Sequence, residues 1–279
     1  MSRVAVVTDS TAYLPAAQAA AAHVTVVPVQ VIVGGQTLDE TDVSPADIAD
    51  ALREWRPIST SRPSPSAFVQ AYQALALEGA EEIVSVHLSG AMSATVESAE
   101  LAAKEVSIPV RVIDSRSIGM GLGFPVLSAA QAASDGAEPA TVEEIARRRS
   151  AGASVLFYVD TLEYLRRGGR IGKAAALVGS ALSVKPLLHL VDGHVTPLEK
   201  VRTTSKALAR LGELAVEGVG EGAADVAVQH LANADRAYAL AARIQESAGD
   251  AVAVTVGEVG AVVGAHVGPG MIAVAVCPR

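Results

Sequence analysis

Short apolar runs alternate with longer amphipathic or alanine-rich segments in the first half of the chain. The runs rich in β-branched residues are expected to be buried strands, at 4–7, 82–88 and 110–113. A further extended run, 24–33, contains Pro28, which indicates an edge strand or a bend. Because helix-forming segments follow these strands, the pattern predicts a mostly parallel sheet with helices on both faces.

The second half carries strand and helix signals together with a hairpin signal. Leu187–Val195 reads as a strand pattern interrupted by Asp192-Gly193, a pair typical of a two-residue β-turn. The remaining strands are expected at 155–159, 224–231, 252–259 and 271–276, with helices at 205–216 and 235–247. A sheet built around a hairpin is at least partly antiparallel.

A polar break at 135–139, DGAEP, precedes the last helix of the first half. The sequence therefore predicts two α/β domains, 1–150 and 151–279, the first with a mostly parallel sheet and the second with a mixed or antiparallel sheet. A chain of 279 residues is long enough for two such domains.

The stretch from Tyr158 to Leu190 carries the densest set of signals. After a strand, Thr161 is a suitable N-cap for a helix that begins at Leu162, and a second helix is expected at 174–184. Between them lies R-R-G-G-R, where two glycines favour a sharp turn that directs Arg170 away from its neighbours. The alternative is an ordinary glycine turn with solvated arginines.

Polar loops follow several strands, as in 8–11 and 89–95, and 58–66 forms a hydroxyl-rich, proline-stiffened loop. Loops that open helices present backbone N–H groups, which attract anions, although the same residues are ordinary helix caps. A glycine run at 119–123 has the spacing G-x-G-x-G and does not follow its strand directly. It therefore favours helix packing over a nucleotide-binding loop, which stays the weaker alternative.

Composition narrows the class of protein. Half of the residues are apolar but only 3% are aromatic, and the formal net charge of −8 argues against nucleic acid as a partner. One cysteine, Cys277, permits no internal disulfide and suggests a cytoplasmic location. The short apolar run at the N-terminus is not expected to be a secretory signal, and no run of about 18 apolar residues predicts a membrane span.

Ser93 and His266 suggest a serine hydrolase as one function. The nucleophile-elbow motif, however, requires glycines two residues before and after the serine, where this chain has Ala91 and Thr95. The histidines show no paired ligand spacing, so no metal site and no cofactor are predicted.

Several motifs in one order resemble the DegV family of fatty-acid-binding proteins. They span the whole chain: T-D-S-T-A-Y-L-P at 8–15, T-S-R-P-S at 60–64, the serine-rich loop at 89–99, V-I-D-S at 112–115 with M-G-L-G at 120–123, Y-L-R-R-G-G-R-I at 164–171, K-P-L-L at 185–188, K-V-R at 200–202 and H-V-G-P-G at 266–270. Ala94 and Val96 stand where the family usually has Gly and Tyr, which bears on the shape of the pocket.

This resemblance implies that a long-chain fatty acid is buried between two α/β domains. Its carboxylate would be bound by Thr60, Ser61 and Ser93, with Arg170 and His266 nearby. The protein would then not be an enzyme itself.

The same resemblance implies that the protein presents the carboxylate to a separate ATP-dependent fatty acid kinase and carries the acyl-phosphate to acyltransferases of phospholipid synthesis. Lys200 and Arg202 are predicted to form a surface for the partner or for phosphate, against the alternative of solvated cations. Any membrane contact is expected to be transient.

Overall fold

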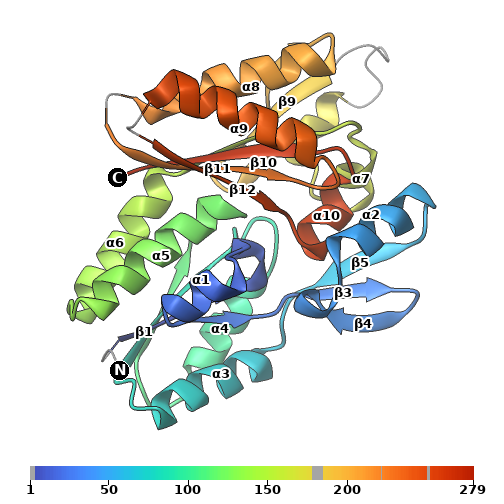
Figure 1. Ribbon diagram of the computed structural model, residues 1–279. Helices are drawn as coiled ribbons and strands as arrows, with labels where there is room; N and C mark the ends of the chain where they lie inside the picture. The colour runs from blue at the N-terminus through green and yellow to red at the C-terminus, as the bar shows by residue number, and fades with distance from the viewer. Residues whose placement is uncertain (1–3, 178–184, 221, 250–251) are drawn as a thin grey trace.

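The computed structural model describes residues 4–177, 185–220, 222–249 and 252–279. Its strands form a four-stranded sheet, a six-stranded sheet and a small three-stranded sheet. Helices α5 (Met120–Ser134) and α6 (Pro139–Gly152) lie between the two larger sheets, and the small sheet extends to one side (Figure 1).

The four-stranded sheet belongs to the first half and is parallel throughout. Its order is β2-β1-β6-β7, formed by β1 (Val4–Asp9), β2 (Val24–Val27), β6 (Glu82–His87) and β7 (Val110–Asp114). Alternate residues face opposite layers, so Val6 packs with α5 whereas Val7 packs with α3 (Pro65–Leu77) and α4 (Thr95–Ala103). Helix α1 (Ala16–Ala21) lies on the α5 side. The predicted parallel sheet with helices on both faces is confirmed.

The six-stranded sheet belongs to the second half and is mixed. Its order is β10-β9-β8-β13-β11-β12, formed by β8 (Ser154–Tyr158), β9 (Lys185–Val191), β10 (His194–Val201), β11 (Ala224–His230), β12 (Val252–Glu258) and β13 (Ile272–Pro278). Only β11 and β12 pair in parallel. Asp192 and Gly193 both adopt positive φ, as a two-residue hairpin turn requires, which confirms the predicted hairpin.

Helices α8 (Thr204–Val219) and α9 (Ala234–Ala248) cover the outer face of this sheet (Figure 1). The four-stranded sheet ends at Asp114 and the six-stranded sheet begins at Ser154. Helix α6 contacts both sheets, and the domain boundary near residue 150 stays a prediction.

The small antiparallel sheet was not expected from the sequence. It has the order β4-β3-β5, from β3 (Gln30–Val33), β4 (Gln36–Asp39) and β5 (Ile58–Ser61). Pro28 divides the predicted run 24–33 between two sheets, because β2 ends before it and β3 begins after it. The prediction of a loop over 58–66 was wrong at both ends. Its first residues form strand β5, and helix α3 already begins at Pro65.

Helices α2 (Pro45–Arg53), α7 (Glu163–Arg167) and α10 (Ala261–Val267) lie beside the small sheet (Figure 1). Helix α2 is capped by Ser44, whose side chain accepts a hydrogen bond from the Asp47 N–H at 3.1 Å. Helix α10 was not predicted. The helix expected at 174–184 corresponds to a 3₁₀ helix over Gly172–Leu177, and its later residues lie outside the described part of the chain.

Among the contacts that join the halves of the chain, two lie at opposite sides of the interface. The buried guanidinium of Arg149 on α6 donates to Asp225 on β11 and to the carbonyl oxygens of Cys277 and Pro278 at the end of β13. On the other side, the Ser89 hydroxyl donates to the Gly193 carbonyl oxygen at 3.0 Å. A Cβ at Gly193 would lie 2.1 Å from the Ser89 Oγ, so the hairpin can dock here only with glycine at this position.

Candidate functional site

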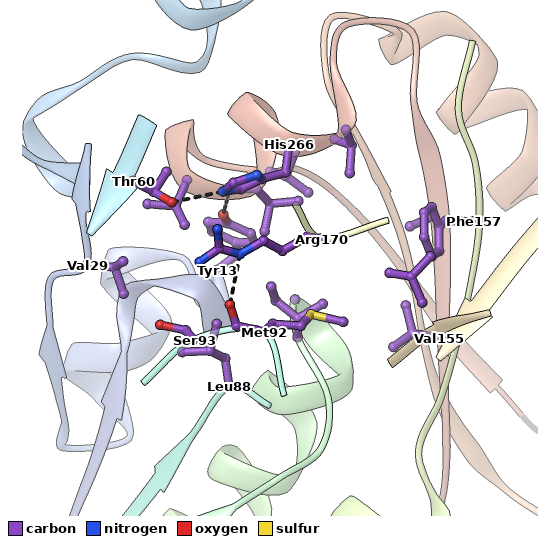
Figure 2. A pocket seen from close by; sticks show the side chains of 18 of the residues that line it. Tyr13, Val29, Thr60, Leu88, Met92, Ser93, Val155, Phe157, Arg170 and His266 are labelled. Atoms are coloured by element: carbon purple, nitrogen blue, oxygen red, sulfur yellow. Dashed lines mark hydrogen bonds between the residues drawn. The ribbon is translucent and has the colours of Figure 1, made fainter. Parts of the chain in front are cut away.

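A cavity lies between the inner face of the six-stranded sheet, the start of α5 and the small sheet. It encloses about 900 Å³ of space not filled by atoms, including the part at its mouth that is open to solvent. Val155 and Phe157 lie on one side, whereas Thr60, Ser93, Arg170 and His266 lie on the other (Figure 2). The candidate head-group residues therefore gather on one side of the cavity.

Aliphatic and aromatic side chains form most of the wall. The apolar residues that line the cavity include Val29, Leu88, Ile118, Val155, Phe157, Leu165, Leu190, Val195, Val259, Val262, Val263, Val267, Met271 and Ala273. Strand alternation explains the contribution of β8, because Val155 and Phe157 point inward while Leu156 and Tyr158 pack under α8 and α9. An elongated apolar cavity with a few polar groups at one end suits an amphipathic ligand.

The polar end brings together every residue that the sequence analysis assigned to the carboxylate. Thr60 and Ser61 end β5, Ser93 lies in the loop after β6, Arg170 follows α7, and His266 lies on α10. The Thr60 Oγ1 and the His266 Nε2 form a hydrogen bond of 2.8 Å (Figure 2). Segments far apart in the sequence therefore converge on one small volume.

His266 is held in an environment that disfavours its charged form. Burial, and then the positive charge of Arg170, lower the pKa of the imidazole to about 4. Its Nδ1 is buried without a hydrogen-bond partner among the described residues. A Cβ at position 168 would lie 2.0 Å from this Nδ1, so the first glycine of R-R-G-G-R makes room for the imidazole.

The second glycine of the pair has a different role. Gly169 has φ +69° and open space around its missing Cβ, so it serves the backbone turn that the sequence predicted. This turn carries Arg170 to the cavity, where its Nε donates to the Met92 carbonyl oxygen at 3.0 Å and its Nη1 to the Gly168 carbonyl oxygen at 2.8 Å (Figure 2). By contrast, Arg166 and Arg167 both pair with Glu163.

Arg170 makes no ion pair with a carboxylate in the described part of the chain, although it lines the cavity beside two hydroxyl-bearing segments. Carbonyl oxygens fix the direction of its guanidinium, and its positive charge has no carboxylate partner among the described residues. Since guanidinium groups bind carboxylates and phosphates through their forked donors, this end of the cavity favours an anionic group.

The loop with Ser93 is anchored by the T-D-S-T segment at the end of β1. The buried carboxylate of Asp9 accepts hydrogen bonds from the Leu88 N–H at 3.0 Å and from the Thr11 N–H at 3.1 Å, and it contacts His87 Nδ1 at 3.1 Å. Asp9 therefore acts as a structural anchor for this loop. The sequence analysis had left open whether the polar residues after β1 were helix caps or site residues.

Ser93 and His266 are not arranged as nucleophile and base. The Ser93 hydroxyl is hydrogen-bonded to the Thr95 hydroxyl at 2.9 Å, whereas the His266 Nε2 is occupied by Thr60. A serine hydrolase requires the serine and the histidine within hydrogen-bonding reach of each other and a group that orients the histidine. The described residues do not provide that geometry.

A buried carboxylate that the sequence analysis missed positions the helix of His266. Glu40 is 4% exposed, and its Oε1 accepts from the Val262 N–H at 2.8 Å and from the Tyr13 hydroxyl at 2.9 Å. The Tyr13 hydroxyl in turn accepts from the Val263 N–H at 3.0 Å, so Glu40 and Tyr13 together cap α10. Burial raises the pKa of Glu40, although hydrogen bonds from Ser10, Val262 and Tyr13 oppose that effect.

Lys200 and Arg202 lie at the end of β10 and just after it, and both are exposed. Neither is among the residues that line the cavity. The structure is thus compatible with a surface role, which stays a prediction.

The glycine run forms the start of α5. Gly119, with φ +63°, is its N-cap residue, and a Cβ at Gly121 or Gly123 would lie within 2.8 Å of neighbouring atoms. This arrangement confirms close packing. Among the described residues, no group of three or more His, Cys, Asp or Glu is placed to hold a metal ion, and no helix is both long and apolar enough to cross a membrane.

Comparisons with known proteins place this fold and site in one group. Residues 3–279 match a family model described as an uncharacterised protein, DegV family. A DegV domain-containing protein of Streptomyces coelicolor is 51% identical over 281 residues, with all of both chains covered. A DegV domain-containing protein of Deinococcus radiodurans is 41% identical, with 99% of this chain and 98% of that one covered.

Two solved structures are similar over the full length of both chains. One, described as showing fatty acid binding of a DegV family protein from Thermus thermophilus, has a TM-score of 0.93 and 33% identity. The other, described as DegV, a fatty acid binding protein from Bacillus subtilis, has a TM-score of 0.91 and 29% identity. Together with the match over nearly the whole sequence, these similarities show that the chain belongs to the DegV family.

Proposed function

We propose that this protein binds a long-chain fatty acid in the cavity, with the carboxylate at Thr60, Ser61 and Ser93 and with Arg170 and His266 beside it. The observation that supports this most strongly is the uncompensated guanidinium of Arg170 at the polar end of an otherwise apolar cavity. The two structural relatives described as fatty-acid-binding proteins support the same ligand class.

The tail supplies most of the binding free energy in this proposal. Each buried CH₂ contributes about 0.8 kcal/mol, so a long acyl chain gains on the order of 10 kcal/mol before the cost of ordering is subtracted. Hydrogen bonds to the charged head group add roughly 1.5–3 kcal/mol each. The head-group residues therefore fix the orientation of the ligand, while the apolar wall provides the affinity.

We further propose that the protein is a cytoplasmic carrier that presents the bound carboxylate to a separate ATP-dependent kinase and delivers the acyl-phosphate to an acyltransferase. Arg170 is exposed and lines the polar end of the cavity, so a partner protein could reach a carboxylate bound there. The buried tail would stay out of its reach. Lys200 and Arg202 supply exposed positive charge on a chain of net charge −8, which suits contact with phosphate or with an acidic partner surface.

Substitution of the head-group hydroxyls should weaken binding without unfolding the protein. We expect Thr60→Val and Ser93→Ala each to reduce fatty-acid affinity by about 1–3 kcal/mol, because each removes a donor to a charged acceptor. Titration of delipidated protein with fatty acid measures the effect. Thr37→Val, at an exposed position on strand β4 at the other edge of the small sheet, is the matched control and should leave affinity unchanged. Unchanged affinity in Thr60→Val and Ser93→Ala, with loss of an esterase activity, would instead support the hydrolase.

Fatty-acid binding should raise the pKa of His266. A carboxylate next to the imidazole favours the imidazolium, opposing the burial and the Arg170 charge that lower this pKa to about 4. We expect an increase of at least about one unit. The measurement is an NMR titration of the His266 ring with and without bound fatty acid, with His266→Gln used to assign the signal. A pKa that stays the same or falls on binding would place the carboxylate elsewhere.

Substitutions of Arg170 and Arg202 should have different effects on fatty-acid binding and on phosphorylation of the bound fatty acid. We expect Arg170→Ala to reduce both, because Arg170 lies at the cavity, and Arg202→Ala to leave fatty-acid affinity nearly intact while lowering kinase-dependent acyl-phosphate formation at least about tenfold. Arg243→Ala, an exposed cation on α9, controls for a general loss of charge. Equal loss of binding and phosphorylation in Arg202→Ala, or loss of neither, would show that its predicted role is wrong.

A further inference from the structure

A polar side chain lies in the apolar part of the cavity, away from the head-group residues. Gln229 on β11 lines the cavity and is only 4% exposed. The other described residues that the six-stranded sheet contributes to the wall are apolar: Val155, Phe157, Leu190, Val195 and Ala273. Gln229 is therefore an amide in a wall that otherwise suits a hydrocarbon tail.

The strand register places Gln229 in the same cross-strand row as Phe157. Gln229 pairs with Ala273 on β13, and Ala273 pairs with Phe157 on β8, so the three side chains form one row across the sheet. Phe157 lies on the side of the cavity opposite Thr60 and Ser93 (Figure 2). A ligand with its carboxylate at Thr60 would therefore meet Gln229 with its tail.

One half of the Gln229 amide has a structural role that fixes its orientation. Its Oε1 accepts a hydrogen bond of 2.8 Å from the N–H of Met120, the first residue of α5. Because a backbone N–H only donates, this contact identifies the oxygen and sets the direction of the amide. A Cβ at Gly119 would lie 2.4 Å from that oxygen, so glycine at this position makes the contact possible.

The other half of the amide has no such role. The Nε2 carries two N–H groups, and no described residue accepts a hydrogen bond from either. This nitrogen is not one of the fully enclosed polar atoms that lack a partner, so it is open to the cavity, and a purely structural cap for α5 would need only the oxygen. The position thus provides donors that face a ligand tail.

We propose that Gln229 forms a subsite for an oxygen atom on the acyl chain, so that the protein accepts hydroxy or keto fatty acids as ligands. This inference rests on the proposed fatty-acid binding and specifies its ligand class. A hydroxyl or carbonyl oxygen on the tail accepts from the Nε2, whereas in a wall without Gln229 the same oxygen would be buried with no partner.

The test compares stearic acid with a series of hydroxystearic acids that differ in the position of the hydroxyl group. Delipidated full-length protein is titrated with each, and the affinity of each hydroxy acid is expressed relative to that of stearic acid. For one position of the hydroxyl group on the acyl chain, or for two adjacent positions, we expect this ratio to fall about tenfold in Gln229→Met. A tenfold change in affinity corresponds to the free energy of about one hydrogen bond. Methionine matches glutamine in length and removes the donors.

Two controls isolate the hydrogen bond. Gln131→Met removes an exposed amide on α5 that does not line the cavity, so its ratios should match those of the unsubstituted protein at every position. A ketostearic acid with oxygen at the favoured carbon should bind more tightly than stearic acid, as the hydroxy acid does, because the Nε2 only donates. Ratios that are equal in Gln229→Met and the unsubstituted protein, a similar fall in Gln131→Met, or a gain confined to the hydroxy acid would each overturn the proposal.

The unsubstituted protein alone also decides the question if Gln229→Met fails to fold. A peak of about tenfold in affinity at one hydroxyl position supports the subsite, whereas a flat or steadily changing series contradicts it and leaves an ordered water as the partner of the amide. Failure of stearic acid itself to bind would instead contradict the proposed function, so the two failures are distinguishable.

Discussion

The hydrogen bond between Thr60 and His266 joins the two parts of the chain that form the polar end of the cavity. It links β5 of the small sheet to α10, across more than two hundred residues of sequence, at a distance of 2.8 Å. The imidazole reaches this position only because Gly168 has no Cβ, and Gly169 then turns the chain so that Arg170 reaches the same site. The two glycines of the R-R-G-G-R segment therefore determine the geometry of the polar end, and its last arginine supplies the positive charge.

This polar end depends on a second, deeper network. Glu40 is a carboxylate taken out of water, which is unfavourable unless hydrogen bonds compensate it. The hydroxyls of Ser10 and Tyr13 and the N–H of Val262 supply that compensation and fix the start of α10. The segment after the first strand of the chain, the small sheet and the helix of His266 are thus held together by buried polar contacts, while most of the cavity wall is apolar.

The sequence pattern predicted the larger sheets because most of their strands are continuous apolar runs rich in β-branched residues, and it predicted the hairpin at Asp192 because that turn has strict backbone requirements. It missed the small sheet, whose strands are four residues each and partly exposed. It also missed α10, because a short run of Ala, Val and Gly carries no helical periodicity. The candidate residues at the polar end came from the family resemblance and not from periodicity. Glu40 and Gln229 gave no signal, since a buried contact with a distant backbone N–H leaves no local pattern.

Native mass spectrometry of the freshly purified protein shows whether the cavity holds a long-chain fatty acid. We expect a species heavier than the polypeptide by the mass of one long-chain fatty acid, which is released on denaturation and identified after extraction. A tail enclosed between the halves of the chain should leave slowly enough to survive chromatography. If the protein carries no lipid and takes up none when fatty acid is added, the proposed fatty-acid binding is wrong.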